Sequence, residues 1–141
     1  MSINDPTSFN MPPSIEGIIS KLSPYSVEET LNHLQEAMRS RNLSVFAHIN
    51  HSGEAEQIGL KMQKAHVLIF GNPKSGTPLM ITSPLLALDL PLKLLIWQSN
   101  DGRVWVSYTS VAYLAARYSI PPELTGNIAG IDGLVESTLR S

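Results

Sequence analysis

The chain has 141 residues and no cysteine, and its 10 Lys and Arg against 12 Asp and Glu give a net charge of −2. This length fits one domain, which buries roughly 68–70% of its unfolded surface and folds without disulfides or metals. The composition excludes thiolate chemistry, and no basic stripe is present that would bind nucleic acid. The chain lacks a secretory signal pattern and an apolar run that could span a bilayer, so we expect a cytoplasmic protein without a membrane contact.

Residues 1–13 hold three prolines and no periodic pattern, which predicts a disordered leader ahead of a single domain over 14–118. A first strand is expected over 15–22. The helix that follows has a capping box, with Ser26 as N-cap and Glu29 three residues later. Its apolar face has helical spacing and comprises Val27, Leu31, Leu34 and Met38.

Alternation of apolar and polar residues over 43–50 predicts a second strand. Ser52 can cap a short helix that runs to about Lys61, and the apolar run over 65–70 predicts a third strand. The segment 71–76, which is bounded by two glycines, is expected to be a turn.

Thr77 and Pro78 have the residue types of an N-cap and a first helical position, which predicts a helix over 77–88. Pro84 lies inside this segment and should bend or split the helix.

A strand over 90–97 and its partner over 104–109 are joined by an Asn-Asp-Gly turn, which predicts a hairpin. A short helix over 110–118 follows. The remaining segment, 119–141, combines two consecutive prolines with three spaced glycines. These residues predict a loop and a short helix over about 132–139 that packs on the domain.

Strands and helices alternate along the chain before it reaches the hairpin. This order predicts an α+β fold, a two-layer α/β sandwich with a mixed sheet of about five strands and helices mainly on one face. The alternative has one or two helices on each face. Bulky residues alternate with those assigned to the helix-covered side, namely Phe46, Leu95, Trp97 and Trp105. Because few helices remain to cover this second face, we expect a homodimer formed through it.

The turn over 71–76 leads from an apolar strand into a helix, and backbone N–H groups at such a position can bind an anion. Its glycine spacing is that of a phosphate-binding P-loop, but Thr77 replaces the required lysine and Pro73 removes one donor. What remains is a site for a small anionic ligand. We expect this site to comprise Gly71, Asn72, Lys74, Ser75, Gly76 and Thr77. The alternative is a structural turn in which Thr77 only caps the helix.

His48 and Asn50 lie on one side of the strand over 43–50, so both could face the same ligand. His48 could also act as a general base near neutral pH, with Asp89 as a candidate partner. No carboxylate is spaced to orient His48, so a structural histidine is the competing interpretation, and we favour a structural acceptor role for Asp89. No spacing indicates a metal site, a cofactor or a serine nucleophile.

Several segments between residues 46 and 118 occur in an order that is typical of one protein family. They are Phe46-Ala47-His48-Ile49, Asn50-His51, Ala55, Gly59-Leu60, Leu68-Ile69-Phe70-Gly71-Asn72-Pro73-Lys74, Gly76-Thr77-Pro78-Leu79-Met80, Leu88-Asp89-Leu90-Pro91-Leu92-Lys93 and Gly102-Arg103-Val104-Trp105-Val106-Ser107-Tyr108. In these segments the chain resembles a bacterial and archaeal family known as domain of unknown function 302. The resemblance implies a small α/β domain, usually a compact dimer, with no established activity.

One position departs from the family pattern. The family commonly has Ile-Asp-His where this chain has Ile49-Asn50-His51. The change would disable a catalytic aspartate, whereas a hydrogen-bonding role would survive it. The enzyme interpretation is therefore weakened for this chain.

Three functions stay open from the sequence. The first is a dimeric module that binds a small anionic ligand between the turn over 71–77 and the end of the strand over 43–50. The second is a hydrolase or isomerase that uses His48 as a base, and the third is a purely structural protein-interaction domain. We favour the first and lean against an enzyme, because no complete catalytic set is evident.

Overall fold

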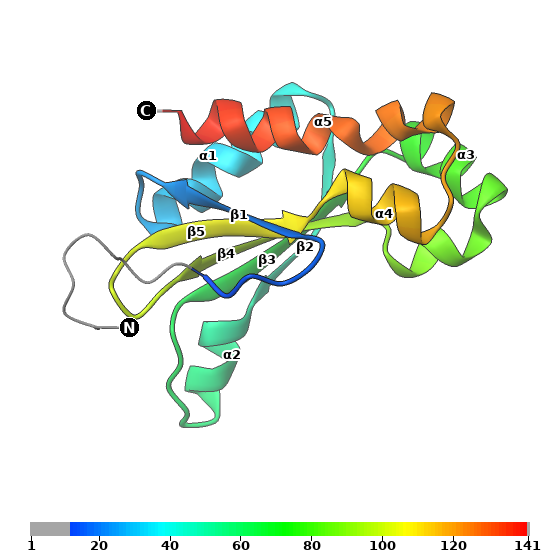
Figure 1. Cartoon of the computed structure of the whole chain (residues 1–141). Coiled ribbons are helices and arrows are strands. Elements are labelled where there is room, and N and C mark those ends of the chain that lie inside the picture. The colour runs from blue at the N-terminus through cyan, green and yellow to red at the C-terminus, as the bar shows by residue number, and fades with distance from the viewer. Residues whose placement is uncertain (1–11, 141) are drawn as a thin grey trace.

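The computed structural model describes residues 12–140, so the expected leader over 1–13 lies, apart from its last two residues, outside the described residues. Figure 1 shows how the elements are arranged. The strands are β1 (Ile18–Ser23), β2 (Ser44–Asn50), β3 (Ala65–Gly71), β4 (Leu92–Gln98) and β5 (Val104–Thr109). The helices are α1 (Val27–Ser40), α2 (His51–Gln57), α3 (Pro73–Thr82), the short 3₁₀ helix η1 (Pro84–Leu88), α4 (Val111–Arg117) and α5 (Pro122–Leu139).

The strands form one sheet in the order β1-β5-β4-β3-β2, and every neighbouring pair is antiparallel. α1 and α5 cover one face of this sheet (Figure 1). The structure thus confirms an α+β two-layer sandwich with helices mainly on one face. The expected mixed sheet is wrong, because α2 and α3 do not cross the sheet between the strands they connect, and from β2 to β5 each strand returns beside the previous one.

α1 makes the long connection of the fold. β1 and β2 lie at opposite edges of the sheet and run in the same direction, so the chain between them crosses the whole sheet. α1 covers one face of the sheet on the way (Figure 1). The predicted capping box is confirmed: Glu29 N–H donates to Ser26 Oγ at 3.1 Å, and Ser26 N–H donates to the Glu29 carboxylate at 3.3 Å.

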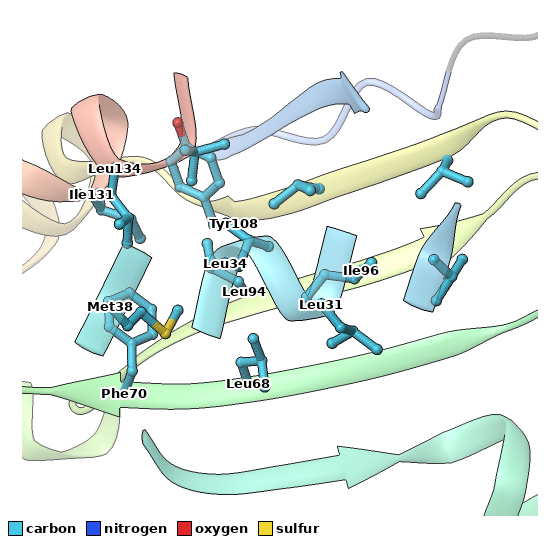
Figure 2. Close-up of a cluster of buried hydrophobic side chains, with 14 residues drawn as sticks. Leu31, Leu34, Met38, Leu68, Phe70, Leu94, Ile96, Tyr108, Ile131 and Leu134 are labelled. Atoms are coloured by element: carbon cyan, nitrogen blue, oxygen red, sulfur yellow. The ribbon is translucent and has the colours of Figure 1, made fainter. Parts of the chain in front are cut away.

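The main core lies between the helix layer and the sheet. The apolar face predicted for α1 is buried there, and Figure 2 shows its side chains among those of the sheet and of α5. The labelled side chains that meet α1 are Leu68, Phe70, Leu94, Ile96, Tyr108, Ile131 and Leu134. Each fully buried aliphatic side chain of this kind contributes about 1.5–3 kcal/mol, so this layer contact is the main source of stability.

A second apolar cluster joins α3, η1, α4 and α5 at one end of the sheet. It consists of Leu79, Leu86, Leu114, Ile120 and Ile128. As predicted, the chain breaks at Pro84, where η1 begins. The cluster thereby holds α3 and η1 against α5 rather than on the face of the sheet.

α5 is a single helix of 18 residues, where the sequence predicted a loop and a short helix. Pro122 lies in its first turn, where a missing N–H costs no helical hydrogen bond. The three glycines in the helix each cost about 1 kcal/mol, but a buried apolar stripe on the same helix outweighs them. That stripe consists of Ile128, Ile131, Leu134 and Val135.

Polar contacts also fix α5 to the sheet. The Tyr108 hydroxyl on β5 donates to the Asp132 carboxylate at 2.5 Å, and Lys21 on β1 pairs with Glu136 at 3.2 Å. Burial, followed by the hydrogen bond to Asp132, raises the pKa of Tyr108 above its ordinary value. The hydroxyl therefore stays protonated and remains the donor.

Replacing Gly133 with Ala tests the continuity of α5. Gly133 is exposed and a Cβ built there meets no atom within 4 Å. The substitution should therefore raise the free energy of unfolding, measured in urea, by about 0.5–1 kcal/mol.

Gly17→Ala is the contrasting variant. Gly17 has a φ of +81°, and a Cβ there would lie 2.5 Å from the Tyr113 ring, so this change should destabilise the fold. An unchanged or lower stability of Gly133→Ala would contradict a helical backbone at that position.

Candidate functional site

A cavity of about 370 Å³ opens at one end of the sheet. Its walls come from the start of β2, the end of β3, α3, the start of β4 and the middle of α5. α3 and α5 contact each other at this end of the molecule (Figure 1), and the second apolar cluster holds them together. The volume lies within the range of small-molecule sites, roughly 300–1,000 Å³.

The lining of this cavity is mostly apolar. The apolar side chains are Leu43, Phe46, Phe70, Pro73, Met80, Leu90, Pro91, Leu92, Ile128, Ile131 and Leu134. Asn72, Ser75, Thr77 and Asn127 add polar groups, and Arg41 is the one charged residue among the lining residues that the structure describes. Asn127 Nδ2 donates to the Ser75 carbonyl oxygen at 2.9 Å, which ties α5 to α3 beside the cavity. Walls of this composition favour a ligand with a hydrocarbon body.

α3 begins earlier than predicted, at Pro73, with Asn72 as its N-cap. The N–H groups expected to hold an anion are used inside this first turn. Lys74 N–H donates to Asn72 Oδ1 at 3.0 Å, and the N–H groups of Ser75 and Gly76 donate to the Asn72 carbonyl oxygen at 2.9 and 3.0 Å. These N–H groups, on which the predicted anion site depended, therefore already have partners within the protein, because Asn72 rather than Thr77 caps the helix.

Five of the predicted ligand residues nevertheless line the cavity. They are Gly71, Asn72, Ser75, Gly76 and Thr77. Lys74, which was expected to supply a positive charge, is exposed and does not belong to the lining. His48 and Asn50 do not belong to it either.

His48 and His66 form a pair near the other end of β3. His48 Nε2 and His66 Nδ1 are 2.9 Å apart, and one ring donates to the other. Burial, together with the charge of His48, lowers the pKa of His66 below its ordinary value. The geometry agrees with a hydrogen-bonded structural role for His48.

Asn50 caps α2, a role that the sequence analysis gave to Ser52. Asn50 Oδ1 accepts from Gly53 N–H at 2.8 Å and from the Ser52 hydroxyl at 3.0 Å. Asparagine and aspartate are both favoured N-caps, and each offers the same acceptor oxygen. The Asp-to-Asn departure from the family pattern therefore leaves this cap intact.

Asp89 lies at the end of η1, away from His48. Its carboxylate accepts a hydrogen bond from the Tyr118 hydroxyl and lies 3.5 Å from the Arg117 guanidinium. The hydrogen bond to Asp89 is the main cause that raises the pKa of Tyr118. Neither Asp89 nor His48 lines the cavity, so the structure does not bring the two catalytic candidates together.

Sequence reasoning missed Arg41 and the α5 wall of the cavity. The α5 wall had a signal, since Ile128, Ile131 and Leu134 recur at helical spacing, but the prolines and glycines were given more weight. Arg41 had none. It follows α1 in the chain, and only the fold brings it to α5, where its Nη2 donates to Ser137 Oγ at 3.0 Å.

Two of the four residues predicted for the dimer face have other roles. Trp105 is 2% exposed, and its indole N–H donates to Ser99 Oγ at 3.1 Å. Phe46 lies at a β-bulge in β2 and borders the cavity. Leu95 and Trp97 are half-buried on the sheet face opposite α1 and α5.

These features define the class of the protein, a two-layer α+β domain with one antiparallel sheet and an apolar cavity at the end of that sheet. The sequence matches the family described as Domain of unknown function DUF302 over residues 19–138. The chain belongs to this family, and the match extends from β1 to α5, beyond the segments that first indicated it.

A solved structure has the same fold. It is the crystal structure of an uncharacterized conserved protein DUF302 from Bacillus stearothermophilus, with a TM-score of 0.73 and 19% sequence identity. The match covers 89% of this chain and 97% of that chain. At this identity the likeness concerns the fold alone.

Curated relatives match over a part of their length. The chain is 35% identical over 104 residues to a fluoride-specific ion channel, FluC 1, of Brucella suis, covering 74% of this chain and 41% of the channel. The same identity is found with FluC 1 of Brucella abortus and FluC 2 of Brucella melitensis, of which 38% is covered. The chain thus spans about two fifths of these relatives. Within residues 12–140, no helix combines the length and the apolar character needed to cross a membrane.

The lowered pKa of His66 predicts a loss of stability in mildly acidic solution. Because the folded state binds the proton more weakly, the unfolded state takes up more protons as the pH falls through the ordinary value of 6.5, and the free energy of unfolding decreases. Protonation of both rings also removes the acceptor of the His48–His66 hydrogen bond. We expect a lower free energy of unfolding in urea at about pH 5.5 than at about pH 7.5, and a smaller difference for His66→Gln.

His33→Gln, on α1, is the control for this measurement and should keep the wild-type difference. If His66→Gln shows the full wild-type pH dependence, the histidine pair is not its origin.

Proposed function

We propose that this domain is a small-ligand-binding module and that its ligand lies in the cavity between the sheet, α3 and α5. The observation that carries the proposal is the open cavity of about 370 Å³, since concave, mostly apolar clefts of this size are typical ligand sites and are few in one protein. Apolar walls with a few converging polar groups are the usual composition of ligand pockets.

Binding is preferred to catalysis because each catalytic candidate is engaged outside the cavity. His48 is hydrogen-bonded to His66, and Asp89 to Tyr118. Fluoride conduction is not proposed for this chain, because the match to the Brucella channels covers about two fifths of those proteins. The cytoplasmic location expected from the sequence stays a prediction.

We also propose that two copies associate through the sheet face opposite α1 and α5. Strand register places Ile18 and Leu22 of β1 and Ile49 of β2 on this face, where they are 41%, 50% and 38% exposed. Exposed apolar side chains that share one face are typical of an interaction surface. Leu95 and Trp97 would add to the same surface.

Filling the cavity tests the first proposal. Gly130 lines the cavity and a Cβ built there meets no atom within 4 Å, so the side chain of Gly130→Leu can occupy the space a ligand would need. We expect fragments that bind the wild-type protein in ligand-observed NMR to lose binding to this variant.

Gly133→Leu is the matched control, since Gly133 lies on the same helix and does not line the cavity. Circular dichroism checks that both variants fold. Fragments that bind both variants equally would place the ligand elsewhere and contradict the proposal.

Sedimentation equilibrium tests the second proposal. Leu22→Lys would bury two like charges in a symmetric interface, so it should raise the dimer dissociation constant by at least about tenfold. Leu85→Lys, at a 72% exposed position on η1, should leave the dimer unchanged. A monomeric wild-type protein would refute the proposed association.

A further inference from the structure

Arg41 brings a positive charge to the apolar cavity. It is the C-cap residue of α1, and its Nη2 donates to Ser137 Oγ on α5 at 3.0 Å. This hydrogen bond holds the guanidinium between the end of α1 and α5, beside the cavity that Arg41 lines. The side chain is exposed, so a ligand can reach it from solvent.

The charge of Arg41 has no acidic partner in residues 12–140. The carboxylates on the same stretch of α5 are engaged elsewhere: Asp132 accepts from Tyr108, and Glu136 pairs with Lys21. The described lining of the cavity contains no Asp or Glu. The cavity is therefore an apolar space with one positive charge that no protein carboxylate balances.

We propose that the cavity binds an amphiphilic carboxylate, with its hydrocarbon part against the apolar walls and its carboxylate on Arg41; this inference rests on the proposed ligand-binding function. A guanidinium presents five N–H donors in a planar fork, and Ser137 uses one nitrogen. A carboxylate can accept two parallel hydrogen bonds from such a fork.

The cavity walls determine the size and shape of the hydrocarbon part of the ligand. Each methylene group removed from water strengthens binding roughly fourfold, and the cavity walls include Leu43, Leu134 and the Phe46 and Phe70 rings. Met80 adds a flexible side chain that can adapt to ligand shape. A cavity of about 370 Å³ lies at the lower end of the usual range, which suits a medium-length chain or a small ring system.

A single negative charge fits this site better than a phosphate. A phosphate monoester carries about −1.5 to −2 charges near neutral pH, which one guanidinium does not balance. The backbone donors that could have assisted, the N–H groups of Lys74, Ser75 and Gly76, are already used within the first turn of α3. The single negative charge of a carboxylate, by contrast, is balanced by the single positive charge of Arg41.

Isothermal titration calorimetry of the full chain with octanoate and with octanamide tests the inference, because the two probes share a chain and differ in charge. We expect octanoate to bind the wild-type protein more tightly than octanamide does. Arg41→Gln should weaken octanoate binding by up to about fivefold, the effect of one exposed ion pair, and leave octanamide binding unchanged. Arg39→Gln, which removes an equal charge from the last turn of α1 outside the cavity lining, should bind both probes as the wild-type protein does.

Gly130→Leu should remove binding of both probes. If Arg41→Gln does not fold, Arg41→Lys replaces it; this variant keeps the charge without the fork and should lose a part of the octanoate affinity.

The outcomes separate this inference from the proposed function. If both probes bind equally and Arg41→Gln changes neither, the carboxylate inference fails while the cavity remains a ligand site. The same holds if octanoate does not bind but neutral fragments do, with loss in Gly130→Leu. If no probe and no fragment depends on Gly130, both proposals fail together.

Discussion

The packing of α5 across the sheet is the constraint on which both the core and the cavity depend. Its C-terminal half places Ile131, Leu134 and Val135 in the main core, and its N-terminal half places Ile128 in the second apolar cluster. The hydrogen bond from Tyr108 to Asp132 fixes the rotation of the helix about its axis, because Asp132 must face β5. With this rotation set, Asn127 and Gly130 lie along the cavity. Core and cavity are therefore positioned by one helix, and α5 cannot move away from α3 without disturbing the sheet layer.

The cavity stays open because three positions on its walls have no side chain. Gly71 ends β3, Gly76 lies in α3, and Gly130 lies in α5. A Cβ at Gly76 would come no closer than 3.9 Å to Leu90 and Met80, and one at Gly130 would meet nothing within 4 Å. Larger residues at these helical positions would thus be sterically accepted, and alanine would favour the helix by about 1 kcal/mol at each. Glycine at these two positions lowers helix stability and keeps the cavity open. Packing of the helices alone does not explain this choice of residue.

Local sequence patterns predicted those parts of the structure that depend on neighbouring residues, and they failed for the parts that depend on contacts between residues far apart in the chain. The capping box at Ser26 and Glu29, the five strands and the β4–β5 hairpin all follow from residues close together in the chain. The antiparallel connectivity depends on tertiary packing. So does the continuous α5, in which packing outweighs the low helix propensity of its glycines and prolines. The candidate site was likewise predicted only in its local part. The strand-to-helix junction from Gly71 to Thr77 was located, but its chemistry depended on which residue capped α3, and Arg41 reaches the cavity only through the fold.

The position of the positive charge decides what kind of ligand this fold can hold. Free N–H groups at the start of α3 would have bound a small inorganic anion through the backbone, whatever surrounded it. A single exposed arginine cannot do this, because an ion pair in water contributes only about 0–1 kcal/mol and is screened by salt. Affinity must then come mainly from apolar burial in the cavity, while Arg41 selects the orientation and the charge of what enters. The internal use of the backbone N–H groups and the apolar walls thus favour the same ligand, one in which a hydrocarbon part and an acidic group are joined.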